Sequence, residues 1–307
     1  SLITLDQFYE IKPLTKLESI LSFVDYSLFE EVFPYDSNKR GPKGYSKKQL
    51  FNTLIAMQIE QLSDIKALVM RLKSDSVLRR SLGYDYIENT PSAATLNRFI
   101  TLLSGTDILG RTFRRMVCKA RKLGLIDGTN VAIDASKLTS YEHAVPKSKI
   151  PMEDTTFPNW GGKLDTNENF IKWFGWKMHV LVDTYSGLPI SYIITPANIA
   201  DVDVAEKLIQ KMMDDYKNGL TPKYYMMDAG YDKPELYSSV YHKYHGQAII
   251  PINWRNTKIP PEGINWNGQF VCPMNYAYVY GGNDNGTIRI LYPHACGKCD
   301  FSLKVFI

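Results

Sequence analysis

The stretch Asn130-Val131-Ala132-Ile133-Asp134-Ala135 is a short apolar run closed by an acid. Such a run predicts a buried β-strand. A second apolar run, residues 224–227, ends at Asp228 in the same way. The two runs therefore predict two strands of one sheet, each with an aspartate at its end.

Strand and helix patterns alternate around these two runs. Residues 177–183 and 188–195 predict two strands joined by a tight turn, and residues 247–251 predict a last strand. One helix is expected to open near Asp201 and another near Asp232, where Pro and Glu follow in the first turn. The order β-β-β-α-β-α-β indicates an α/β fold, a mixed sheet with covering helices.

Two segments of this half lack periodicity. Residues 139–172 hold several prolines and the pair Gly161-Gly162, so we expect an exposed loop there. Beyond Asn253 the chain is rich in Tyr, Asn, Gly and Pro and shows little pattern. The last segment has no clear structural prediction.

Helical patterns dominate the chain before Gly124. Short amphipathic helices are expected in residues 1–37, and further helices with Ser46 and Ser63 as N-caps follow. Another helix is expected to begin near Pro91-Ser92. No strand pattern occurs between residue 46 and about residue 123, so this part is predicted to be all-α and similar to a helix-turn-helix module.

We therefore expect three parts, residues 1–123, 124–253 and 254–307. Positive charge is concentrated in one of them. Residues 38–122 carry 17 Lys and Arg against six Asp and Glu, whereas residues 1–37 carry two against seven. A concentrated positive segment suits phosphate binding, although a solvated set of basic helices would have the same composition.

The composition excludes several classes of protein. Apolar residues make up 44% and charged residues 22%, which is ordinary for a globular chain. No apolar run is long enough to span a membrane, and the N-terminus lacks the pattern of a signal peptide. Four cysteines are too few for a disulfide scaffold. A soluble protein in the reducing cytoplasm is the expectation.

Asp134 and Asp228 are the candidate catalytic residues. Side chains at strand ends emerge into a crevice, and two adjacent strands would bring these carboxylates together. Converging carboxylates repel each other unless cations neutralise them, and oxygen ligands suit Mg²⁺ or Mn²⁺. Two such ions can activate an attacking water or 3′-hydroxyl in phosphodiester chemistry. The alternative is that each aspartate only terminates its strand.

The combination of motifs resembles the catalytic domain of DDE-type bacterial insertion-sequence transposases. The motifs are Val131–Ser136, Gly175–Asp183, Gly187–Pro189, Thr195–Asn198 and Met227–Asp232. The basic helical part resembles the N-terminal module of this family at residues 41–54 and 90–99. The resemblance implies an RNase H-like fold, DNA cleavage and strand transfer, and Mg²⁺ or Mn²⁺ as cofactor.

The same resemblance implies three acidic metal ligands, of which Asp134 and Asp228 match the first two. The third is a glutamate on a helix near the C-terminus, and it has no match here. Glu235 comes too early, and Glu262 lies among prolines and a glycine where no helix should form. We therefore expect this chain to be truncated at its C-terminus, to bind metal weakly and to be inactive by itself.

The expected partners are double-stranded DNA, namely the terminal repeats of the element, and a second copy of the chain in a homodimer; no membrane partner is expected. The residues expected to bind DNA are Lys39, Arg40, Lys43, Lys47, Lys48, Arg98, Lys177 and His179. Packing or ordinary surface placement would explain Lys177 and His179 equally well. Asp201 matches an acid that the family often places here, but a helix N-cap also explains it. Tyr231 either stacks on a DNA base or simply packs within the protein.

Cysteines near the C-terminal end have the spacing of half a zinc site. Cys296-Gly297-Lys298-Cys299 follows Cys272, and His294 is the obvious local fourth ligand. Bound Zn²⁺ at Cys272, Cys296 and Cys299 and free thiols are both consistent with this spacing.

Two other functions remain open at this point. One is a DNA-binding protein that has lost the chemistry and competes for the element's ends. The other is a metal-dependent nuclease on the same fold, which would need neither specific end binding nor strand joining. A helical glutamate followed by Lys or Arg in the reading frame past Ile307 would favour the transposase.

Overall fold

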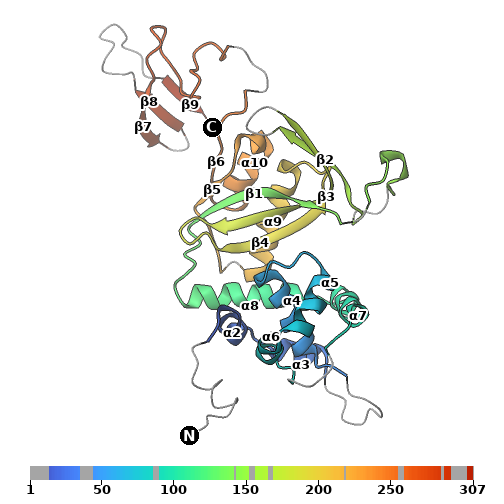
Figure 1. Cartoon of the computed structure of the whole chain (residues 1–307). Coiled ribbons are helices and arrows are strands. Elements are labelled where there is room, and N and C mark those ends of the chain that lie inside the picture. The colour runs from blue at the N-terminus through green and yellow to red at the C-terminus, as the bar shows by residue number, and fades with distance from the viewer. Residues whose placement is uncertain are drawn as a thin grey trace. The chain divides into compact units, whose positions relative to one another are not determined.

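The structure, a computed structural model, describes ten stretches of the chain (Figure 1). They are residues 14–34, 44–85, 90–141, 143–151, 156–164, 169–217, 219–254, 259–284, 287–291 and 303–306. The chain divides into two compact units, residues 1–118 and 119–307. Each unit is described by itself. No helix in the described stretches is both long and apolar enough to cross a bilayer.

The first unit is helical throughout its described residues. Its helices are α2 (Lys16–Phe23), α3 (Ser27–Val32), α4 (Lys47–Ile59), α5 (Ile65–Ser74), α6 (Ser76–Ser81), α7 (Ala93–Ser104) and α8 (Ile108–Lys122), the last of which runs into the second unit. The all-α prediction for this part is confirmed over the described residues.

Side-chain caps fix where these helices begin. Ser46 caps α4 in a capping box with Gln49, as predicted, and Ser92 caps α7, which begins where a helix was predicted. Ser63 was expected to cap the next helix, but Asp64 does so by accepting a hydrogen bond from the Ala67 amide at 2.8 Å. A carboxylate is among the strongest N-cap groups, which explains the shift by one residue.

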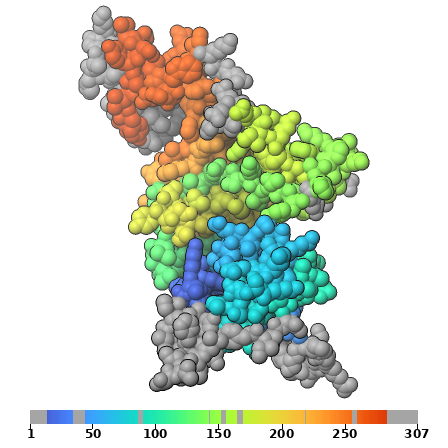
Figure 2. Space-filling model, viewed as in Figure 1, coloured from blue at the N-terminus to red at the C-terminus, as the bar shows by residue number. Residues whose placement is uncertain are grey.

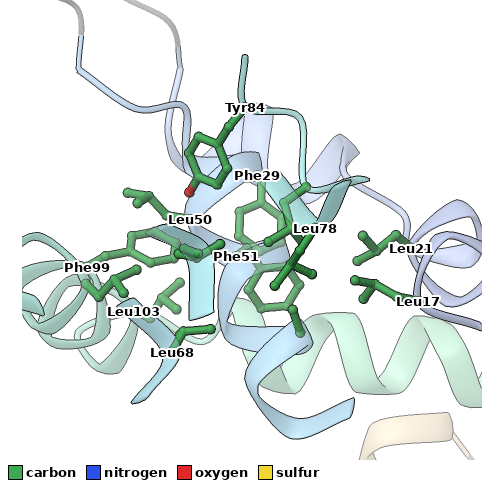
Figure 3. Close-up of a cluster of buried hydrophobic side chains, with 14 of the residues drawn as sticks. Leu17, Leu21, Phe29, Leu50, Phe51, Leu68, Leu78, Tyr84, Phe99 and Leu103 are labelled. Atoms are coloured by element: carbon green, nitrogen blue, oxygen red, sulfur yellow. The ribbon is translucent and has the colours of Figure 1, made fainter. Parts of the chain in front are cut away.

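One apolar core joins the helices of the first unit (Figure 3). The rings of Phe29 and Phe51 lie 4.5 Å apart between centroids, and Leu68 is fully buried near them in the same cluster. The buried Tyr84 hydroxyl finds a partner in the hydroxyl of Thr53 at 2.8 Å. Burial raises the pKa of Tyr84 to about 12, so the phenol stays neutral in the core.

The second unit contains a six-stranded mixed sheet. Its strands are β1 (Asn130–Thr139), β2 (Asn159–Leu164), β3 (Phe170–Asp183), β4 (Pro189–Pro196), β5 (Tyr224–Met226) and β6 (Gln247–Ile249). The strands β1, β3 and β4 are antiparallel neighbours, and β5 and β6 continue from β1 in parallel. This confirms the predicted RNase H-like mixed sheet.

The prediction of a loop over residues 139–172 was wrong in part, because β2 pairs with the first half of β3. Gly161 and Gly162 are not turn residues here. A β-carbon on Gly161 would meet the Trp173 ring at 2.5 Å, and one on Gly162 would collide with the Phe170 ring. The two glycines let large aromatic rings lie against the backbone of a strand.

Helices follow β4 and β5, in the predicted order. Helix α9 (Val202–Tyr216) buries the predicted apolar face, including Leu208 and Met212, and α9 contacts β3 and β4. Helix α10 (Pro234–Ser238) continues as the π-helical turn η3 (Ser239–Lys243) before β6. The predicted cap at Asp232 is replaced by Lys233, because the Asp232 carboxylate accepts hydrogen bonds from Asn253 and Tyr237 instead.

A buried carboxylate closes the far end of β3. Asp183 accepts hydrogen bonds from the Gly128 amide at 2.8 Å and from the amide and hydroxyl of Ser186 at 2.9 and 2.7 Å. Burial alone would raise the pKa of Asp183, but these donors outweigh it and hold the pKa below its ordinary value. The turn after β3 is thereby tied to the start of β1.

A small antiparallel sheet occupies the last segment, for which the sequence predicted no clear structure. It consists of β7 (Val279–Asp284), β8 (Thr287–Leu291) and β9 (Leu303–Phe306). The strands are short, and glycine and asparagine interrupt their alternation, so the sequence carries little strand signal here.

The core of the helical unit can be tested on one helix. Leu68→Ala should lower the free energy of unfolding by about 2–5 kcal/mol, because it leaves a cavity where Leu68 is 0% exposed. Met70→Ala is the matched control on α5, 71% exposed, and should change stability by less than about 0.5 kcal/mol. Urea unfolding followed by circular dichroism measures both, and equal losses would contradict the assigned core.

Candidate active site

Asp134 lies in β1, and Asp228 lies two residues after the end of β5, which pairs with β1 in parallel. Ala132 of β1 is in register with Met226 of β5. Asp134 comes two residues after Ala132, and Asp228 comes two residues after Met226. Both side chains are exposed. The structure thus brings the two aspartates together, at the edge where β5 ends and β1 continues.

Local backbone bonds orient each carboxylate. Asp134 accepts a hydrogen bond from the Ala135 amide at 2.7 Å, and Asp228 accepts one from the Gly230 amide at 2.9 Å, in both cases through Oδ1. A β-carbon at residue 230 would lie 3.0 Å from Oδ1 of Asp228. Glycine at this position therefore lets the chain turn closely around the carboxylate.

The charges of three carboxylates act on the hydroxyl of Tyr231. The side chain is buried, and its hydroxyl has no hydrogen-bond partner among the described residues. Burial raises the pKa of Tyr231 most, and the negative charges of Asp201, Asp134 and Asp228 raise it further. Tyr231 packs in the core, which agrees with one of the two predictions.

Asp201 is the residue whose role differs most from the expectation. It sits at the N-cap position of α9, but its side chain makes no capping hydrogen bond. Its Oδ1 accepts instead from Nζ of Lys177 at 2.8 Å and lies 3.7 Å from Nδ1 of His179. The carboxylate is directed toward two cationic or basic groups of β3, away from the helix backbone.

Lys177 and His179 face inward, where phosphate contact had been expected. The Lys177 side chain is 15% exposed and also donates to the Ile199 carbonyl at 2.9 Å. The His179 side chain is 1% exposed, and its Nε2 shares a hydrogen bond with the Thr195 hydroxyl at 2.9 Å. In this conformation the ring of His179 is too buried to touch DNA.

Burial lowers the pKa of His179 below its ordinary value. The charge of Asp201 raises the pKa in part, and the ammonium of Lys177 lowers it again. The imidazole is therefore neutral at pH 7. Its Nδ1 is buried without a hydrogen bond to any described residue and lies 3.7 Å from Oδ1 of Asp201.

The donor chemistry of this edge fits a hard divalent cation. Asp134 and Asp228 each leave Oδ2 free of the backbone bonds named above, and carboxylate oxygens are preferred by Mg²⁺ and Mn²⁺. Within the described stretches, however, no three His, Cys, Asp or Glu side chains are grouped closely enough to hold a metal ion. The described residues thus offer two candidate ligands, Asp134 and Asp228.

In the helical unit, two of the predicted DNA-binding lysines lie over aromatic rings. Nζ of Lys47 is 5.9 Å from the ring centre of Phe99, and Nζ of Lys48 is 4.5 Å from that of Tyr26. Arg98 is exposed on α7. The other three predicted residues, Lys39, Arg40 and Lys43, lie outside the described residues.

Acids of the N-terminal helices neutralise part of the basic surface. Arg111 forms an ion pair with Glu31 at 2.8 Å, and Arg115 forms one with Asp25 at 2.8 Å. The charge of residues 38–122 therefore overstates the number of cations that are free for a ligand.

The proposed zinc ligands are only partly described. Cys272 is buried as a free thiol. Cys296 and Cys299 lie outside the described residues, so the zinc prediction stays a prediction.

Two family models match the chain. One, described as a transposase DDE domain, matches residues 119–265, and the other, described as a transposase domain, matches residues 5–102. No curated protein matches the chain in sequence.

Solved structures with distant similarity are also transposases. A piggyBac transposase synaptic complex with hairpin DNA is 11% identical with a TM-score of 0.38, and the match covers 89% of this chain and 55% of that one. The Mos1 transposase paired-end complex with its left transposon end is 9% identical with a TM-score of 0.24, covering 79% and 70%. The chain thus spans about half the length of the piggyBac protein.

The role of Asp201 can be tested against its neighbour on α9. Asp201→Asn leaves the half-buried Lys177 ammonium without its carboxylate and should lower the free energy of unfolding by about 1–3 kcal/mol. Asp203→Asn removes an exposed pair with Lys233 and should cost less than about 1 kcal/mol. Chemical denaturation at pH 7 compares them, and equal small effects would show that Asp201 is an ordinary surface acid.

The pKa of His179 predicts a pH dependence of stability. The folded pKa is lowered relative to about 6.5 in the unfolded chain. Protons then bind the unfolded state more readily, so stability should be full above about pH 6.5 and should fall as the pH drops toward the folded pKa. His179→Gln should flatten this part of the profile of unfolding free energy between about pH 5 and 7. An unchanged slope would mean that His179 does not titrate on unfolding.

Proposed function

The chain belongs to the DDE-type insertion-sequence transposases, and from this membership we propose that it serves DNA strand cleavage and strand transfer with Asp134 and Asp228 as catalytic carboxylates. The two matched domains leave few of the described residues outside the family. The observation that supports the assignment of residues is the parallel register of β1 and β5, because each aspartate follows a paired residue of these strands by two positions.

Asp134 and Asp228 would hold Mg²⁺ or Mn²⁺. When bound, such ions supply the activation of a water or 3′-hydroxyl and the stabilisation of the leaving oxygen in phosphodiester chemistry. The backbone amides of Ala135 and Gly230 keep one oxygen of each carboxylate fixed, so the remaining oxygens are pre-oriented. The backbone would therefore orient the two proposed carboxylate ligands without help from a bound ion.

Asp201, Lys177 and His179 form a supporting layer, in our proposal. Asp201 keeps the Lys177 ammonium at the edge of the acid cluster, and the buried ring of His179 fixes the position of Asp201. A cation held there offsets the repulsion among the acids around Tyr231. Asp201 and His179 are thus positioning residues that act through their neighbours.

A third carboxylate is needed to complete the site. Asp134 and Asp228 would supply two ligands, and Glu235, exposed on α10, belongs to no group of three metal-binding side chains among the described residues. With two ligands, the ions should bind weakly. The same observation favours a second function for residues 1–307 alone, the binding of element ends without cleavage.

The basic helical unit is the proposed DNA-binding part. Lys47 and Lys48 lie in the first turn of α4, where backbone amides add to the attraction for phosphate, and Arg98 is exposed in the middle of α7. Double-stranded terminal repeats are the proposed ligand. A homodimer is proposed because the two ends of an element must be held together.

The metal site is tested by manganese binding and by cleavage. Mn²⁺ titration followed by electron paramagnetic resonance should show weak binding to residues 1–307, and Asp134→Asn and Asp228→Asn should each abolish it. Asp203→Asn, with an exposed carboxylate on α9, is the control and should leave binding unchanged. Retained Mn²⁺ binding in both variants would remove the two aspartates from the site.

The requirement for a third carboxylate is tested on DNA. Residues 1–307 should bind duplex DNA in a gel-shift experiment but should not nick it in Mg²⁺. Cleavage that Asp134→Ala abolishes would support the transposase but would refute the need for a further ligand.

A further inference from the structure

Two adjoining pockets lie beside the candidate active site, in the part of the second unit that the sequence had assigned to a loop. The larger has a volume of about 710 Å³ and the smaller about 350 Å³. Trp160 and Lys147 border both, so the pockets share a wall. These volumes are in the range of small-molecule sites. Figure 2 shows the green surface of this region at the edge of the unit.

The walls combine aromatic rings with lysines. Phe157 and Trp160 line the larger pocket, and Trp160 and Phe170 line the smaller. Lys207 lines the larger pocket and Lys172 the smaller, while Lys147 serves both. No aspartate or glutamate is among the described residues that line either pocket. Aromatic rings flanked by cations are the combination that stacks bases and attracts phosphates.

The three lysines are exposed, and Nζ of Lys172 lies 5.7 Å from the centre of the Phe170 ring in the same pocket wall. None of Lys147, Lys172 and Lys207 forms an ion pair with a residue in the described stretches. This separates them from Lys177, which Asp201 already neutralises. The Trp160 indole is held in place, because its Nε1 donates to the Val145 carbonyl at 2.8 Å. A ring fixed in this way offers stacking surface at a low cost in conformational entropy.

The larger pocket and the candidate active site share backbone. Thr195 and Ile199 line the pocket. The Thr195 hydroxyl is the partner of His179, and the Ile199 carbonyl accepts from Lys177. A strand bound in the pocket would therefore lie against the segment that positions Asp201.

We propose that these two pockets, which we call the Trp160 groove, bind unpaired nucleotides of a single DNA strand next to the active site. The proposal rests on the proposed function, because it takes DNA as the ligand. Bases would stack on Trp160 and Phe157 or Phe170, and the three lysines would neutralise the phosphates. The groove adds recognition of single-stranded DNA to a chain whose helical unit is proposed to bind duplex.

Binding of a labelled oligothymidine of about twelve nucleotides, a length within the range of known single-strand sites, tests the groove by fluorescence anisotropy. In Lys147→Gln/Lys207→Gln, affinity should fall and the slope of log K against log salt should drop by about 0.7 for each lost phosphate contact. The matched control is Lys217→Gln, an exposed lysine at the opposite end of α9, which should bind as the wild type does.

Trp160 is tested in two steps. Trp160→Ala should weaken binding of the oligothymidine about fivefold or more, and Trp160→Phe should restore much of it, since a smaller ring still stacks. The Phe variant and the lysine variants keep the test informative if the Ala variant unfolds. A duplex of matching length, bound by the helical unit, should be affected little by any of these changes.

Each outcome of these experiments either supports or overturns the Trp160 groove. Unchanged oligothymidine binding in the lysine variants and in Trp160→Ala would overturn the groove and leave the proposed function standing. Equal losses for oligothymidine and duplex, or an equal loss in Lys217→Gln, would also overturn it, because the effect would be general electrostatics. A wild-type chain that binds neither DNA would overturn both the groove and the proposed function.

Discussion

Parallel pairing between β1 and β5 is the constraint on which the candidate site depends. The pairing runs from Asn130 with Tyr224 to Ala132 with Met226, and the sheet then ends on one side while β1 continues. A slip of one residue would turn one aspartate to the opposite face of the sheet. The buried residues Val131 and Tyr225, which pair with each other, prevent such a slip, because both would lose their place in the core. The packing of these two core residues therefore fixes which side chains lie at this edge of the sheet.

The carboxylates at the same edge are only partly compensated by positive side chains of the protein. The negative charges of Asp201, Asp134 and Asp228 all raise the pKa of the buried Tyr231, and like charges near one another are costly without positive charge. Lys177 provides one fixed positive charge through its pair with Asp201. The remaining two acids are more exposed and have free oxygens. Lys177 thus compensates the charge of Asp201, which only positions its neighbours. The charges of Asp134 and Asp228, where a metal ion would bind, are not fully compensated by the protein.

The sequence predicted the sheet well, because strands such as residues 177–183 are apolar runs with clear ends. The predictions from sequence failed at certain glycine and aspartate positions, because each of these residue types can serve two different structural purposes. Gly161 and Gly162 looked like a turn, but they provide room for aromatic rings, which only the partner strand β3 reveals. Asp201 looked like a cap, and nothing in its local sequence shows that Lys177, far away in the chain, binds it. Side-chain partners across a sheet carry no short-range signal.

The ion pairs of α8 have a consequence for the entropy of association. Arg111 and Arg115 already rest on carboxylates of the N-terminal helices. An arginine that is already paired with a carboxylate of its own chain neutralises few charges of a polyanion, so it releases few of the cations that are condensed on that polyanion. Titration with a heparin-like polymer would therefore count fewer ionic contacts than the formal charge of the helical unit suggests. The carboxylates of the N-terminal helices would thereby weaken the non-specific binding of polyanions to the helical unit.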